Sequence, residues 1–546
     1  MRFLTCLAVT LVYCWNSFGQ IASIELSNDF RIGETEYKDQ TVSNAVFQQN
    51  HFYTVSNSGA PGGKWLFTKL YDLKYKVTLS KFDRDMNRLK EFKLGNGDQK
   101  YGPLMPELFL FNKQMILAYF ESSNNTSFDL YLSVVDENDL SLTSPKKICS
   151  IQQENLGIMK VESILSGGLV QFTTSPDDSK LLVVAKGSGN KVQTIILNKN
   201  LEQLRQASFQ AGLPSFLIES MVLTNDEKTC LTISSDDATR IIAINQEGKK
   251  TEMAFNAAGN LKPYYTKAKL ARNGNSIIIY STTSPNDQEV AWCNGLLIAQ
   301  LDLASFKLSK PNAYEFPVEF IQAIAKQGGG EKIKKEHVLY NFEPNLLQLD
   351  NGTIAITGSP EASSTTTASS APNSNNQSHM VATTTVIVGP VLVFYPNPNG
   401  NTFDHISLPR KIVYSRRARS GSGSIQMVQS PSISISSSGY ISSVRGNEII
   451  LLYNDNESNL QRAEGEKTVT TKSAGDLSLA EAFINQDKQL AHRKLVSESQ
   501  KGRSSYYLGN TVQNSTAAIV FPIAKEGQGF NSRKTFYTNW CFLKLN

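Results

Sequence analysis

Residues 175–204 read SPDDSKLLVVAKGSGNKVQTIILNKNLEQL and decide the fold class of this chain. The stretch has a polar turn, a short apolar run, a Gly/Asn break, a second apolar run and another polar turn. Short apolar runs rich in Val and Ile are typical of β-strands that are buried on both faces. The stretch therefore predicts a small β-meander.

The same pattern recurs along nearly the whole chain. Asn and Asp suit its tight turns because their side chains bond to the nearby backbone and tolerate left-handed geometry. Self-similarity at roughly 50 to 90 residues, built from short strands, is typical of a β-propeller. We expect an all-β chain, with residues 20–546 forming one β-propeller domain of seven or eight blades. The eight turns that we predict are Gln49-Asn50, Asn112-Lys113, Asp177-Asp178, Asn225-Asp226, Asn273-Gly274, Asn351-Gly352, Arg445-Gly446 and Gln513-Asn514.

Further elements follow from the same pattern. The alternating stretch 21–26 is a candidate for the strand that completes the last blade. Apolar residues at helical spacing predict an inter-blade helix within 318–337, broken at Gly328-Gly329-Gly330. We expect outer strands of five repeats at 77–82, 130–135, 194–197, 241–244 and 296–301.

The N-terminus has the features of a secretory signal peptide. Arg2 precedes an apolar run at 3–15, and Ser17-Phe18-Gly19 places small residues at a cleavage site. We expect residues 1–19 to be removed and the protein to be exported to the periplasm, the cell surface or the extracellular space. An uncleaved anchor and a lipid attached at Cys14 are the alternatives. No later segment has 18 uninterrupted apolar residues, so no transmembrane helix is predicted.

Composition restricts the function only weakly. The 546 residues are 40% apolar and 19% charged, which is ordinary for a globular protein, and the formal net charge of +5 is too small to indicate a nucleic-acid partner. Beyond the signal segment the cysteines are Cys149, Cys230, Cys293 and Cys541, and none forms a C-x-x-C pair. Buried free thiols are favoured, while one or two disulfides remain open. We expect a monomer.

Two polar insertions interrupt the sixth and seventh repeats. Residues 359–385 are rich in Ser, Thr, Asn and Pro and cannot bury much apolar surface, so we expect a flexible loop. Residues 454–475 are a second flexible insertion in the corresponding place. Both would extend the same hairpin of neighbouring repeats, which makes that face the first candidate for a binding surface.

The repeat in 175–204 is similar to that of bacterial exported propellers, in which an S-P-D-G-like turn leads into a strand. Residues 342–358, 438–454 and 514–545 resemble uncharacterised secreted proteins of Bacteroidota-type bacteria. The resemblance implies a propeller and brings no functional motif with it.

Motifs that carry catalysis are absent from the sequence. There is no G-x-S-x-G elbow, H-E-x-x-H motif, Walker loop or Rossmann fingerprint, and the five histidines are scattered singly. We therefore expect no cofactor and no metal, and an enzyme is the less favoured class. The alternative is a propeller hydrolase or lyase that uses carboxylates in the central channel, which requires several acidic side chains to converge.

One basic cluster stands out as a candidate binding site. Such a cluster could hold a polyanion such as a glycan or a lipid headgroup, although a solvated loop explains it as well. The favoured function is a non-catalytic binding or scaffold module that presents loops to an envelope protein or a glycan. The cluster consists of Arg410, Lys411, Arg416, Arg417 and Arg419.

Overall fold

The fold is described from a computed structural model of the chain. The predicted signal peptide lies outside the described residues and stays a prediction. The structure describes residues 21–26, 30–31, 41–48, 51–58, 76–83, 87–94, 104–124, 127–152, 169–213, 216–236, 238–256, 261–285, 292–333, 336–369, 380–421, 424–428, 439–462, 466–472, 476–497, 504–506, 512–515, 518–528 and 534–545.

The stretch that decides the fold class forms most of a four-stranded antiparallel sheet. Its strands follow the chain order β11-β12-β13-β14, and the apolar runs are the two buried central strands. A three-residue 3-10 turn, η3 (Ser188–Asn190), fills the predicted Gly/Asn break. The bounds are β11 (Val170–Thr174), β12 (Lys180–Lys186), β13 (Lys191–Asn198) and β14 (Gln203–Gln210).

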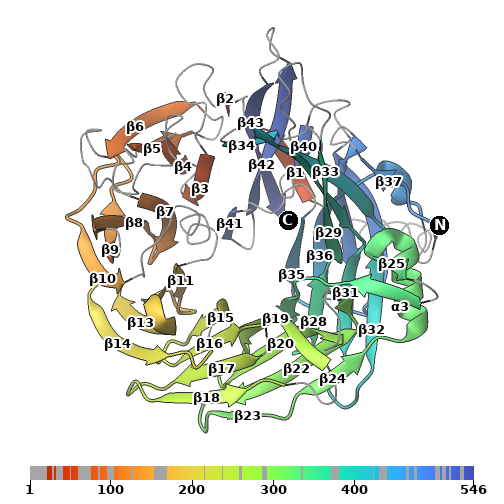
Figure 1. Ribbon diagram of the computed structural model, residues 1–546, viewed down its shortest axis with the longest axis horizontal. Helices are drawn as coiled ribbons and strands as arrows, with labels where there is room; N and C mark the ends of the chain where they lie inside the picture. Colours follow the sequence, from red (N-terminus) through yellow and green to blue (C-terminus); the bar gives the residue numbers. More distant parts are fainter. Residues whose placement is uncertain are drawn as a thin grey trace, which may run out of the picture.

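Similar meanders precede and follow this sheet, and Figure 1 shows the sheets arranged around a ring with the first strands β3, β7, β11, β15 and β19 on the inner side. This arrangement of antiparallel meanders is that of a β-propeller. Before it come β3 (Thr41–Gln48), β4 (His51–Ser58), β5 (Lys76–Phe82) and β6 (Arg88–Leu94), then β7 (Leu104–Phe111), β8 (Gln114–Asn124), β9 (Ser127–Val135) and β10 (Lys146–Gln152). After it come β15 (Leu217–Leu223), β16 (Thr229–Ser234), β17 (Thr239–Ile244) and β18 (Lys250–Ala254), then β19 (Leu261–Leu270), β20 (Ser276–Pro285), β22 (Gly295–Asp302), β23 (Lys307–Leu308) and β24 (Asn312–Glu315).

The last part of the ring contains two further meanders and a closing sheet. The meanders are β27 (Asn345–Gln348), β28 (Ile354–Gly358), β31 (Val391–Pro396) and β32 (Phe403–Leu408), and β35 (Tyr440–Arg445), β36 (Glu448–Asp455), β38 (Ser478–Ile484) and β39 (Leu490–Ser497). The closing sheet contains β1 (Ile21–Leu26), β2 (Phe30–Arg31), β40 (Ser504–Tyr506), β41 (Val512–Ser515), β42 (Ala518–Gln528) and β43 (Lys534–Leu545). In it β1 pairs antiparallel with β43, which confirms that the N-terminal strand completes the last sheet.

Two details of the predicted repeats are wrong. The five predicted outer strands are the third strands of their sheets, because a more polar fourth strand such as β14 lies outside them. Gln513 and Asn514 lie inside β41 rather than in a turn.

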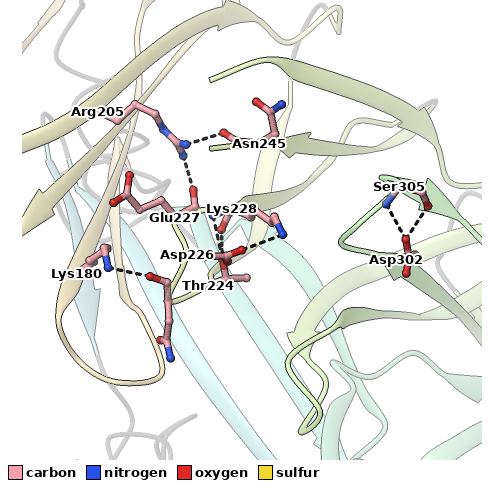
Figure 2. Close-up of polar contacts among 10 residues, drawn as sticks. Lys180, Arg205, Thr224, Asp226, Glu227, Lys228, Asn245, Asp302 and Ser305 are labelled. Atoms are coloured by element: carbon pink, nitrogen blue, oxygen red, sulfur yellow. Dashed lines mark hydrogen bonds and ion pairs between the residues drawn. The ribbon is translucent and has the colours of Figure 1, made fainter. Parts of the chain in front are cut away.

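Neighbouring blades are joined through the turns between their first and second strands. The Asn225 side chain accepts a hydrogen bond from the backbone N–H of Asp177 at 3.1 Å, and the Lys180 ammonium donates to the Asn225 carbonyl at 2.8 Å. Figure 2 shows Arg205 reaching the same region, where its guanidinium donates to the Asn245 carbonyl at 2.6 Å. Polar turn residues therefore connect successive blades on this side of the ring.

The predicted helix is shorter than expected. It consists of α3 (Val318–Ile324) and the π-helical turn η4 (Ala325–Gly329), so it ends at the predicted glycines. The charged residues that follow form a hairpin of β25 (Gly330–Ile333) and β26 (Glu336–Tyr340), which pairs with β21 (Trp292–Cys293). No helix in the described part of the chain has the length and apolar character needed to cross a bilayer.

The expectation of a flexible loop at 359–385 is wrong for the described part of that segment. Its two ends form a hairpin that belongs to a separate sheet, which we call the insertion sheet. Thr is β-branched and suits strands, and Thr365 and Thr384 face each other across the hairpin at 2.9 Å between their hydroxyls. The insertion sheet contains β29 (Glu361–Ser369), β30 (Met380–Val388), β33 (Lys411–Gly421), β34 (Ser424–Val428) and β37 (Thr470–Thr471).

The described part of the second insertion, 454–475, also contains regular structure rather than only a loop. It contains the 3-10 turn η6 (Glu457–Asn459) and β37, and Asn459 and Thr471 are buried. Each insertion lies between the second and third strands of its meander, which confirms that both extend the same hairpin of neighbouring repeats. Because β37 pairs with β33, both insertions contribute to the insertion sheet.

The core consists of apolar clusters between adjacent sheets, as expected for strands that are buried on both faces. Cys149, Cys230 and Cys293 are buried free thiols within this core, as predicted. The side chain of Cys541 is not described.

Candidate functional site

The main candidate site is a pocket of about 870 Å³ between three neighbouring meanders and the insertion sheet, which we call the inter-sheet pocket. Its wall comes from β19, from the segment that precedes β27, from the start of β29 and from β35. Figure 1 shows β19 and β35 at the inner side of the ring. The lining side chains used below are Tyr265, Lys267, Asn341, Glu343, Glu361 and Tyr440.

Tyr265 is presented to the pocket by an irregularity in β19. The pairing of β19 with β20 shifts between Tyr264 and Lys267, and Tyr265 has a positive φ of 49°. Hydroxyl groups hold this bulge in place, since Ser281 donates to the Tyr264 carbonyl at 2.8 Å. Bulges and positive φ at bulky residues are concentrated at functional sites, where they re-aim a side chain. The Tyr265 side chain is accordingly 41% exposed on an inner strand.

An ion pair between Lys267 and Glu343 contributes polar side chains to the pocket lining. The Lys267 ammonium lies 2.6 Å from Glu343 Oε1 and also donates to the Glu219 carbonyl at 3.1 Å. Lys267 is mostly buried, whereas the Glu343 side chain is 65% exposed. Lys267 thus holds Glu343 at the rim, with part of its carboxylate open to solvent.

Glu361 is the second carboxyl group of the pocket. Glu361 is an exposed residue at the start of β29, yet the protein around its carboxyl group displaces enough water to raise the pKa of Glu361, and the charge of Arg410 opposes this shift. Within the described residues, no lysine or arginine lies within salt-bridge distance of Glu361. Burial, followed by the charges of Glu343 and Glu361, also raises the pKa of Tyr265, so these side chains act on one another electrostatically.

Two further side chains complete the floor. The Tyr440 hydroxyl donates to Thr357 Oγ1 at 3.0 Å, and burial raises the pKa of Tyr440 to about 12. Asn341 is only 7% exposed; its Oδ1 accepts from the Phe342 N–H at 2.9 Å, while its Nδ2 has no hydrogen-bond partner among the described residues. Buried amide donors are usually satisfied, so this one indicates an acceptor supplied from the pocket.

The predicted basic cluster is divided by the structure. Arg410 is fully buried, so its inclusion in a solvent-facing binding patch is wrong. Its guanidinium donates to the Gly389 carbonyl at 3.1 Å, to the Gly439 carbonyl at 3.2 Å and to Ser359 Oγ at 2.8 Å. Arg410 therefore supports the pocket wall from behind.

The other members of the cluster lie in β33. Lys411 is half-buried and packs its aliphatic chain against Gly328. The backbones of Arg416, Arg417 and Arg419 are described, but their side chains are not. Polyanion binding by these three arginines stays a prediction.

Sequence reasoning missed the residues of the inter-sheet pocket. Tyr265 and Lys267 precede Glu361 by about a hundred residues, and none of them belongs to a motif. The one local signal of a site is the Asn-Phe-Glu-Pro sequence at 341–344, which separates the strands β26 and β27.

A second pocket, of about 470 Å³, lies at the turns shown in Figure 2. Its polar groups are mutually satisfied: Thr224 donates to Asp226, Lys228 pairs with Asp226 at 2.8 Å, and Ser305 bonds Asp302. Such satisfied turns stabilise the blades and leave few groups for a ligand.

Comparison with known proteins adds no family. No family model matches the chain, and no curated protein sequence matches it. Solved structures that align with it include the WD40 domain of SCAP from fission yeast, at 10% identity over 95% of this chain and 97% of that one, with a TM-score of 0.37. A protein of unknown function from Bacteroides caccae aligns at 12% identity over 51% of this chain and 78% of that one, with a TM-score of 0.24. The periplasmic gluconolactonase PpgL of Pseudomonas aeruginosa aligns at 16% identity over 68% of this chain and 85% of that one, with a TM-score of 0.32. These TM-scores are too low to show a shared fold, so the ring arrangement rests on the strand pairings themselves.

Proposed function

We propose that this protein is an exported, non-catalytic binding module of the bacterial cell envelope, with the inter-sheet pocket as its ligand site. In this proposal residues 1–19 are a signal peptide and residues 20–546 form a single propeller domain of eight blades. The ligand is a protein segment or a glycan.

The observation that carries the proposal is the composition of the pocket wall. A bulge-presented tyrosine, two carboxyl groups and an unsatisfied amide donor meet in one concave site. Ligand sites in proteins are typically concave and combine aromatic surface with a few polar groups that fix orientation. The positive φ of Tyr265 adds to this, since a strained backbone is retained where it serves a function.

The test uses the full mature chain against a glycan array and a displayed library of random peptides. Tyr265→Ala should weaken the selected ligand by about tenfold or more, because aromatic anchors dominate such sites. Leu89→Ala is the matched control: Leu89 is 51% exposed and lies on β6, in another blade, so binding should not change. Ligands that bind wild type and Tyr265→Ala equally well would refute the pocket as the site.

A hydrolase or lyase is the second candidate, and one observation favours it. Glu343 is ion-paired, whereas Glu361 has no such partner among the described residues and has a raised pKa, so the two carboxyl groups differ in environment within one pocket. Pairs of this kind can divide the roles of acid and base in glycoside cleavage. Turnover of a panel of chromogenic glycosides that is lost in Glu361→Gln and kept in Glu448→Gln would establish this function, and no turnover would exclude it for these substrates.

A further inference from the structure

The strand β29 is an open edge beside the inter-sheet pocket. In the part of the chain that the structure describes, β29 is the terminal strand of the insertion sheet and pairs only with β30. Its sequence, EASSTTTAS, contains no Lys and no Pro, and residues 363–367 are exposed. Proteins usually protect an edge of this length with charges, prolines or a covering element, so an unprotected one is available for strand pairing.

The direction of the backbone groups of β29 follows from two hydrogen bonds at its start. The Gly389 N–H donates to the Pro360 carbonyl at 2.8 Å, so residue 360 faces β30. The Glu361 N–H donates to the Asn341 carbonyl at 3.0 Å, away from β30. Because these directions alternate along an antiparallel strand, Ser363, Thr365 and Thr367 direct their N–H and C=O groups toward the open edge.

The segment at Asn341 therefore occupies only the first position of this edge and already pairs with it as a short strand would. Beyond it the edge continues without a partner among the described residues. At the same place the buried Nδ2 of Asn341 lacks an acceptor. A peptide carbonyl is the acceptor that a chain lying along β29 would bring to this donor.

The charges of the pocket restrict the partner further. Lys267 is ion-paired with Glu343. The Glu361 carboxyl group has no cation at salt-bridge distance among the described residues. A basic side chain on the incoming segment would complement Glu361 and the exposed part of Glu343. A basic residue is therefore expected at the pocket end of the ligand.

We infer that the open edge of β29 binds an extended peptide segment of a partner protein as an added strand, with a basic side chain between Glu343 and Glu361. The inference rests on the proposed binding function and names the ligand class of the same site. In β-strand addition the main chain supplies affinity and side-chain pockets supply specificity. Here the main-chain affinity would come from Ser363, Thr365 and Thr367. The specificity would come from the inter-sheet pocket.

The experiment compares two substitutions at Thr365 on the full mature chain. Thr365→Pro removes an N–H that faces the open edge and not β30, so proline is tolerated there and the variant should fold. Thr365→Val keeps the N–H and changes only the side chain. A displayed library of random dodecapeptides is selected on wild type, and the best synthetic peptide is then titrated against all three proteins, whose thermal unfolding is recorded.

The expected result is binding that is about tenfold or more weaker in Thr365→Pro and within about twofold of wild type in Thr365→Val. Copies of the peptide that are N-methylated at alternate residues should lose binding, while methylation at the intervening residues should not. Selected peptides should carry Lys or Arg, and Glu361→Gln should reduce that preference.

Several results would overturn the inference. The first is a peptide that binds Thr365→Pro as tightly as wild type. The second is peptide binding that does not change on N-methylation at either set of residues, and the third is a library that yields no binder. Dimerisation of the chain itself that Thr365→Pro abolishes would assign the edge to a second copy instead. A glycan that binds in a Tyr265-dependent manner while no peptide binds would leave the proposed function standing and refute only the added strand.

Discussion

The Arg410 guanidinium donates a hydrogen bond to the Ser359 hydroxyl at 2.8 Å, and Ser359 lines the inter-sheet pocket. Arg410 is itself fully buried, and the charge of buried Asp455 stabilises its protonated form. A desolvated charge thus connects the pocket wall to the second insertion. Burial lowers the pKa of Arg410 only to about 10, so it remains charged at neutral pH.

Removal of this buried charge should be strongly destabilising. Arg410→Met leaves the carbonyls of Gly389 and Gly439 and the Ser359 hydroxyl without this donor. A buried polar group that loses its hydrogen-bond partner costs about 1–3 kcal/mol of unfolding free energy, which urea denaturation measures. The matched control is Arg88→Met, because the Arg88 side chain is 56% exposed and its pair with Glu91 should contribute less than about 1 kcal/mol. Equal effects of the two substitutions would contradict a structural role for Arg410.

Asp455 should make the stability of the protein pH-dependent. Its Oδ1 accepts hydrogen bonds from the Asn456 N–H at 2.7 Å and Asn459 Nδ2 at 2.8 Å, whereas Oδ2 has no partner among the described residues. Burial raises the pKa of Asp455 from 3.8 to about 7, against the opposing charges of Arg410 and Arg493. The folded protein therefore holds this proton more tightly than the unfolded chain, so its unfolding free energy falls as pH rises between these two values.

Asp455→Asn removes this dependence. Relative to the variant, wild type should lose up to about 4 kcal/mol between about pH 4 and pH 8, because each pKa unit corresponds to about 1.4 kcal/mol. The measurement is urea unfolding of both proteins across this pH range. The same substitution at Asp404, whose side chain is 75% exposed, should leave the profile of wild type unchanged. Parallel profiles for wild type and Asp455→Asn would show that Asp455 is ionised throughout.

The central strands of the meanders could be predicted because short runs of Val and Ile between Asn/Asp turns form few structures other than buried β-strands. The fourth strands were missed: β14, QLRQASFQ, alternates polar and half-buried residues and lacks the apolar run used to find the others. The insertion at 359–385 was misjudged because low apolar content indicates a loop, whereas its Thr residues pair across a hairpin anchored by buried Val386 and Val388.

The candidate site could not be predicted in the same way. Arg410 belongs to a run of basic residues that indicates a solvated loop, and only tertiary packing buries it. Tyr265, Glu343 and Glu361 meet because two meanders and the insertion sheet adjoin at this pocket, which is a property of the tertiary arrangement rather than of local sequence.

The contact between successive blade turns should contribute measurably to stability. Asn225→Ala removes the acceptor of the Asp177 N–H but leaves the Asn225 carbonyl that Lys180 binds. A loss of about 1 kcal/mol is expected, as for other single hydrogen bonds, and is read from the urea midpoint. Asn256→Ala, at an exposed site just after β18 in the connection to the next sheet, should change stability by less than about 0.5 kcal/mol. If Asn225→Ala were equally neutral, this contact would not stabilise the ring.

The bulge at Tyr265 should reverse the usual preference for alanine over glycine in a strand. Both Tyr265→Ala and Tyr265→Gly remove the ring, but only glycine adopts a φ of 49° without a steric cost. A left-handed conformation costs a non-glycine residue about 1–2 kcal/mol, so Tyr265→Gly should be more stable than Tyr265→Ala by about 1 kcal/mol in urea unfolding. At neighbouring Tyr264, which lacks a positive φ, the alanine variant should be the more stable by about 0.5–1 kcal/mol. If the alanine variant were more stable than the glycine variant at both positions, β19 would relax to a regular strand once the ring is removed. The tyrosine side chain itself would then maintain the bulge.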